Sequence, residues 1–74
     1  DAMVSEQIER DVRALVELLP SEQREVVMMR YYSGMSFKEI AEQTGVSINT
    51  ALGRMRYALI NLRRMIREKE LILS

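Results

Sequence analysis

A stripe of apolar residues recurs at three- and four-residue spacing near the start of the chain: Ile8, Val12, Leu15, Val16 and Leu19. This spacing is typical of one face of an amphipathic helix. We predict that the helix runs from about residue 5 to residue 19 and that Ser5 is its N-cap. Pro20 ends this helix and suits the start of the next one.

A second helix is predicted from about residue 21 to residue 32. Val26, Val27 and Met29 are its expected inward residues. The Ser33-Gly34 pair should end it, because glycine adopts the left-handed conformation that a helix C-terminus requires.

Local signals then predict two more helices, over about 37–43 and from about 48 to at least 67. Ser36 and Glu39 have the spacing of a capping box, and Ser47 is a plausible N-cap of the last helix. The expected inward stripe of that helix is Ala51, Met55, Ala58, Leu59, Leu62 and Ile66. The predicted fold is therefore all-α: one four-helix domain over residues 1–74, with a long last helix and no winged elements.

Residues 36–57 have the spacing of a helix-turn-helix. Ala41 is small enough for two helices to cross closely, and Gly45 tolerates the positive φ of a tight turn. Ile40, Val46, Ala51 and Met55 are expected to pack this pair against the first two helices. The second helix of such a motif commonly enters the major groove of DNA.

The face of the last helix opposite its apolar stripe carries side chains suited to DNA: Asn49, Thr50, Gly53, Arg54, Arg56 and Tyr57. Asparagine can pair with adenine, arginine with guanine, and threonine with phosphate. Gly53 is either an adaptation to close approach of DNA or a tolerated weakness in the helix. Leu52 lies at the edge of the core or contacts a thymine methyl group, and we favour the core.

The composition excludes several kinds of functional site. The 74 residues include no cysteine and no histidine, so neither a thiolate metal site nor a histidine base is available. We expect no catalytic activity, no cofactor and no metal, in a cytoplasmic protein without a membrane span.

The charge is distributed unevenly along the chain. Residues 1–45 carry five basic and nine acidic residues, whereas residues 46–74 carry six basic and two acidic residues. The basic half contains the candidate recognition helix, so the charge pattern either lets this face approach a phosphate backbone or reflects two ordinary solvated helix faces that differ by chance.

Specific short motifs occur in a characteristic order: Leu19-Pro20, Arg24-Glu25-Val26, Gly34-Met35-Ser36-Phe37, Glu39-Ile40-Ala41, Gly45-Val46-Ser47, Thr50 and Arg54. In this arrangement the chain resembles region four of bacterial sigma factors, and it is most similar to the extracytoplasmic-function type. The resemblance covers residues 8–67. It implies recognition of the minus-35 promoter element by the last helix, docking on the β-subunit flap of RNA polymerase, and sequestration by an anti-sigma factor.

The resemblance also implies roles for individual residues. Leu52, Gly53, Arg56 and Tyr57 correspond to base-contacting positions, and Ser47, Thr50 and Arg54 to backbone or framing positions. Many members have a basic residue where Leu52 and Tyr57 stand, which implies weaker non-specific binding and an altered minus-35 preference. The chain would then be the C-terminal fragment of a longer protein with an upstream region-two domain.

Met28, Tyr31 and Tyr32 lie near one another on the second predicted helix. They form either an exposed docking surface for a protein partner, such as the flap or an anti-sigma factor, or part of the small core. Two rival functions also stay open at this stage. The chain could be the DNA-binding effector domain of a response regulator or quorum-sensing regulator, or a helical interaction module that does not contact DNA.

Overall fold

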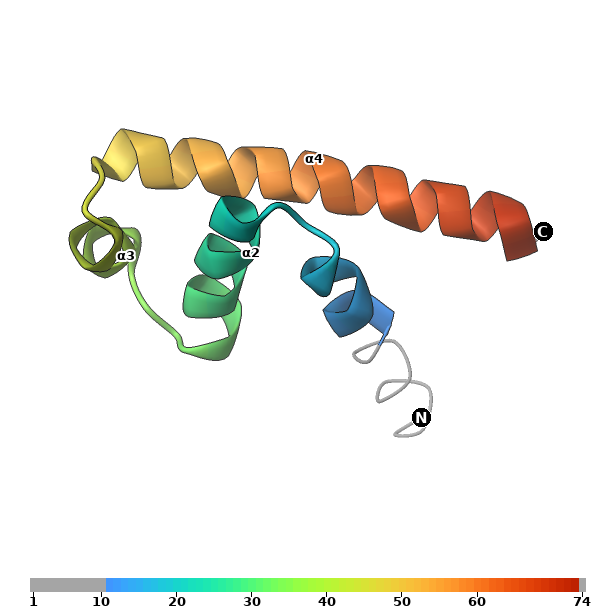
Figure 1. The fold of residues 1–74 in the computed structure, drawn as a ribbon, viewed down its shortest axis with the longest axis horizontal. Coiled ribbons are helices and arrows are strands. Elements are labelled where there is room, and N and C mark those ends of the chain that lie inside the picture. Colours follow the sequence, from blue (N-terminus) through green and yellow to red (C-terminus); the bar gives the residue numbers. More distant parts are fainter. Residues whose placement is uncertain (1–10, 74) are drawn as a thin grey trace.

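The computed structural model describes residues 11–73 of the chain, with side chains described up to residue 69 (Figure 1). Residues 11–17 are helical, and we call them the 11–17 segment. They are followed by α2 (Ser21–Val27), the π-helical turn η1 (Met28–Tyr32), α3 (Phe37–Thr44) and α4 (Ile48–Leu73). The described part of the chain contains no strand, which confirms the all-α prediction. The predicted N-cap, Ser5, and the first residue of the apolar stripe, Ile8, lie outside the described residues.

The long helix α4 organises the domain. Its 26 residues correspond to about 39 Å of helix. In Figure 1 the other helices lie on one side of it, with α3 near its start, α2 next along it, and the 11–17 segment below its middle. The last turns of α4 extend past the other described helices. The opposite side of α4 is not covered by any described element.

A single apolar core joins these helices. Val16, Val26, Ile40, Ala51 and Ala58 are almost completely buried, with at most 1% of each residue exposed. Leu19, Val27, Ala41, Met55 and Leu62 complete the core, and Val12, Leu15, Met29, Val46 and Leu59 pack against it. The predicted packing of the helix-turn-helix against the first two helices is therefore confirmed.

The joint between α3 and α4 follows from local chemistry. The Ser36 side chain accepts a hydrogen bond from the Glu39 backbone N–H at 3.1 Å, and the Ser36 N–H donates to the Glu39 carboxylate at 3.2 Å. This is the predicted capping box. At the other end of α3, Gly45 has φ 69°, and the Val46 N–H donates to the Ala41 carbonyl at 3.0 Å. The positive φ lets the chain reverse direction over three residues before α4 begins.

The second predicted helix has the expected bounds but not the expected geometry. Its second half widens into η1, where the Ser33 N–H donates to the Met28 carbonyl, five residues back, at 3.1 Å. The Met35 N–H then donates to the Met29 carbonyl at 3.0 Å. Gly34, at φ 67°, ends the helix as predicted. π-Helical turns are rare and often mark functional surfaces.

The prediction that Ile66 is a core residue of α4 is wrong. Ile66 is 39% exposed, and Met65 packs against the core instead. Ala58 and Leu62 are buried, and Met65 follows them at helical spacing on the same face of α4. Ile66 lies 100° farther around the helix, outside the face that the other helices cover.

No described helix combines the length and apolar character that spanning a bilayer requires.

Candidate nucleic-acid interface

The first turn of α4 is fixed by the side chain of Ser47. The Ser47 hydroxyl accepts a hydrogen bond from the Thr50 backbone N–H at 3.1 Å and donates to the Thr50 hydroxyl at 3.0 Å. This confirms Ser47 as the N-cap and satisfies one of the free N–H groups at the helix start. Both residues are exposed, so this part of the helix is accessible to a ligand.

Helical periodicity divides α4 into a buried and an outward face. Ala51 and Ala58 are fully buried, and each residue turns the helix by about 100°. Asn49, Gly53 and Arg56 therefore lie on the side opposite the core. Asn49 and Arg56 are exposed. The structure thus brings together an amide and a guanidinium, the two groups best suited to base edges, on one uncovered face.

The two apolar candidates on α4 are also accessible. Leu52 is 43% exposed and Tyr57 is 63% exposed. Leu52 is not among the residues that pack against the core, so the core interpretation that we favoured for it is wrong. Its position is about 100° around the helix from the fully buried Ala51.

The core does not require a glycine at position 53. A Cβ atom built at Gly53 would meet no heavy atom within 4 Å, apart from those of its own helix and its chain neighbours. Because the position is helical and has a negative φ, backbone conformation does not require glycine either. These contacts do not distinguish close approach of DNA at Gly53 from a tolerated weakness in the helix.

Arg54 differs from the other candidates because it is already engaged. Its Nε lies 3.8 Å from Oε2 of Glu22, in the first turn of α2, and the Arg54 side chain is only 24% exposed. Next to this pair, the Asn61 side-chain amide donates a hydrogen bond to Oε1 of Gln23 at 2.7 Å. Sequence analysis missed both α2 residues, since their partners are about 30 to 40 positions away and no local signal connects them.

The second candidate surface lies on η1. Met28, Tyr31 and Tyr32 are 42%, 64% and 37% exposed, and η1 has no buried residue. The three side chains are therefore exposed rather than part of the core. The Tyr32 ring is covered in part by the Arg13 guanidinium, 4.9 Å from the ring centroid, which is a favourable cation–π distance.

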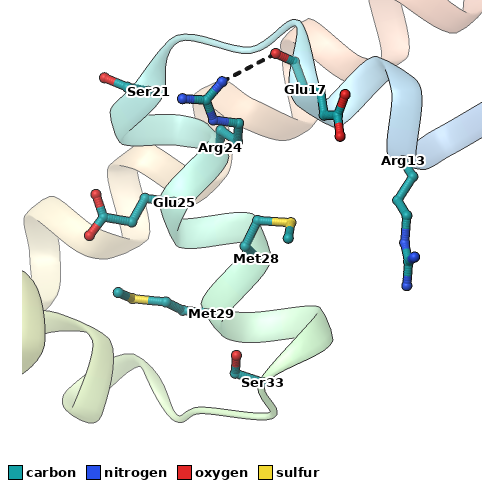
Figure 2. Close-up of a pocket in the computed structure, with 8 residues that line it drawn as sticks. All are labelled: Arg13, Glu17, Ser21, Arg24, Glu25, Met28, Met29 and Ser33. Carbon is teal, nitrogen blue, oxygen red and sulfur yellow. Dashed lines mark hydrogen bonds between the residues drawn. The ribbon is translucent and has the colours of Figure 1, made fainter.

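The three residues border two hollows rather than one. Met28 lines an open groove of about 840 Å³ whose other walls include Arg13, Glu17 and Arg24. Figure 2 shows this groove, with the Arg24 guanidinium donating to the Glu17 carbonyl across one end. Tyr31 and Tyr32 line a smaller, almost entirely apolar hollow of about 330 Å³. The remaining walls of the apolar hollow are Val12, Val16, Val27, Leu59 and Leu62.

Comparison with known families identifies the class of protein. A family model described as "Sigma-70, region 4" matches residues 9–59, which is more than two thirds of the chain. The chain therefore belongs to the sigma-70 region 4 family. A search of curated proteins gives no match.

Family membership defines the general function. Region 4 is a DNA-binding, helix-turn-helix domain of transcription initiation factors, and it takes part in promoter recognition together with RNA polymerase. It is not a known enzyme family. The match favours a sigma-factor domain over the effector domain of a two-component or quorum-sensing regulator, the rival that a similar helix arrangement left open.

Proposed function

We propose that this domain recognises the minus-35 promoter element through the N-terminal half of α4. Leu52, Gly53, Arg56 and Tyr57 are the proposed base-contacting positions, with Asn49 beside them. Ser47, Thr50 and Arg54 are the proposed contacts to the DNA backbone. The observation that carries this proposal is the uncovered face of α4, where exposed polar side chains lie opposite a fully buried alanine stripe.

The chemistry of this face supports few but selective contacts. Arg56 can donate two hydrogen bonds to one guanine, and Asn49 can pair with adenine. Leu52 and Tyr57 add apolar surface of the kind that contacts thymine methyl groups. Because two arginines are the only charged residues between positions 46 and 62, the non-specific attraction to phosphate should be modest.

We further propose that Met28, Tyr31 and Tyr32 form the surface that docks on the β-subunit flap of RNA polymerase. Exposed aromatic and methionine side chains beside an apolar hollow are well suited to receive apolar side chains of a partner. An anti-sigma factor that blocks promoter binding would compete for the same surface. In this proposal the sigma factor is of the extracytoplasmic-function type.

The minus-35 proposal is tested by selecting bound duplexes from a randomised DNA pool at low salt, with the 74-residue chain and an Arg56→Ala control. Enrichment of one short asymmetric element, lost or relaxed in Arg56→Ala, supports recognition by a monomer. A palindromic element would instead indicate a dimeric regulator. No enrichment even when the polymerase core is added would contradict the proposal.

The docking proposal needs a separate measurement. Binding of a purified flap fragment to the chain is measured by isothermal titration calorimetry, with Tyr31→Ala as the test variant. Lys38→Ala, an exposed substitution on α3, is the control. We expect Tyr31→Ala to weaken flap binding at least tenfold, as loss of a central aromatic contact does. Equal affinities for both variants would show that η1 is not the docking surface.

A further inference from the structure

The ion pair between Arg54 and Glu22 joins the candidate interface to a different helix. Glu22 belongs to the first turn of α2, and its side chain is 70% exposed, whereas that of Arg54 is 24% exposed. Among the described residues, Glu22 supplies the only carboxylate within 4 Å of the Arg54 guanidinium. An acidic group thus lies against a helix whose outward face is otherwise basic or neutral up to residue 67.

The position of Arg54 on α4 places this carboxylate at the edge of the proposed interface. Thr50 and Tyr57 are four residues before and three residues after Arg54, so all three share one flank of the helix. Thr50 and Tyr57 are both exposed. A phosphate that approaches Arg54 along this flank therefore meets the negative charge of Glu22.

Stability does not explain the pair. An ion pair with a separation of 3.8 Å and a carboxylate that is 70% exposed contributes little to folding, because water screens the charges and both side chains lose freedom. The hydrogen bond between Gln23 and Asn61 already connects α2 to α4 at the next position of α2. The effect of Glu22 should instead appear when DNA competes for Arg54.

We infer that Glu22 limits the DNA affinity of this domain by competing with DNA phosphate for Arg54. It holds the guanidinium against α2 in the free protein and repels the backbone of any duplex. Both effects weaken binding to all sequences. A duplex with the correct bases compensates through contacts on the outward face of α4, and a random duplex does not. Glu22 therefore lowers the affinity for target and random DNA by a similar factor, so that stable binding requires the base contacts. This inference rests on the proposed DNA-binding function.

The test compares two isosteric substitutions on α2, Glu22→Gln and Glu25→Gln. Each removes one exposed negative charge, but Glu25 has no ion-pair partner among the described residues. Binding of the selected duplex and of a scrambled duplex is followed by fluorescence anisotropy over a range of salt concentrations. Circular dichroism and urea unfolding verify that both variants fold like the wild-type chain.

We expect Glu22→Gln to strengthen binding of both duplexes by a similar factor, so that the ratio of the two affinities stays the same, because both offer phosphate to Arg54. The slope of log affinity against log salt should become more negative by about 0.9, which corresponds to one additional phosphate contact. Glu25→Gln should leave the slope and the ratio unchanged. In an Arg54→Ala background, Glu22→Gln should no longer change the slope, as a double-mutant cycle requires.

Equal slopes for Glu22→Gln and Glu25→Gln would overturn the inference, because any change in DNA affinity would then follow from net charge alone. Weaker binding of both duplexes by Glu22→Gln would also overturn it, because Glu22 would then aid binding. The proposed function fails in a different way. In that case the wild-type chain shows no preference between the two duplexes, and Arg56→Ala has no effect on either.

Discussion

The side-chain amide of Asn61 in α4 donates a 2.7 Å hydrogen bond to the side-chain oxygen of Gln23 in α2. The two residues are 38 positions apart and both are partly buried. This bond joins the first turn of α2 to the middle of α4, outside the apolar core.

Replacing Gln23 with alanine should therefore destabilise the domain. The Asn61 amide would lose its partner in a partly buried position, and we expect a loss of about 1–2 kcal/mol. The free energy of unfolding is measured by urea denaturation. Gln43→Ala, an exposed glutamine on α3, is the control and should change stability by less than about 0.5 kcal/mol. Equal losses in the two variants would contradict a structural role for the bond.

Gly45→Val should destabilise the turn of the helix-turn-helix. Gly45 has φ 69°, but a Cβ atom there would meet nothing within 4 Å, so the penalty comes from the backbone alone. We expect a loss of about 1–2 kcal/mol, seen as a lower Tm. Gly45→Asn should cost less, because asparagine tolerates the left-handed region. An unchanged Tm for Gly45→Val would refute the turn assignment.

Gly53→Ala should separate the two explanations of this residue. The new methyl group points into open space, and alanine favours a helix interior by about 1 kcal/mol over glycine. We expect a higher Tm together with weaker binding of the selected duplex, because the methyl group would obstruct close approach of DNA. A higher Tm with undiminished DNA affinity would show that Gly53 is only a tolerated weakness in the helix.

Arg56→Ala should relax base preference at one position of the selected element. We expect a cost of about 1–3 kcal/mol on the preferred sequence and little change on sequences that differ at that position. Affinities for a set of single-base variants measure the effect. Arg63→Ala, an exposed arginine two turns farther along α4, is the control. A uniform loss on all sequences would indicate that Arg56 contacts phosphate instead of a base.

The exposure of the proposed interface could be predicted largely from α4 alone. A helix with Ala51, Met55 and Ala58 inward must turn Asn49 and Arg56 outward, and all five residues are found as predicted. Two site residues were exceptions. Arg54, which was expected on the outward face, is 24% exposed and pairs with Glu22. Leu52 is apolar, so a core position was a reasonable expectation, but its side chain is 43% exposed and does not pack against the core.

The sequence by itself determined the local structure. Ser36 and Glu39 cap α3, Gly45 turns the chain, and Ser47 starts α4, because each of these signals acts on backbone groups within a few residues. The tertiary structure alone decided which distant side chains meet. The exposure of Ile66 and the two pairs between α2 and α4 depend on the angle at which helices cross. That angle is a property of the packed core, and no short stretch of sequence contains it.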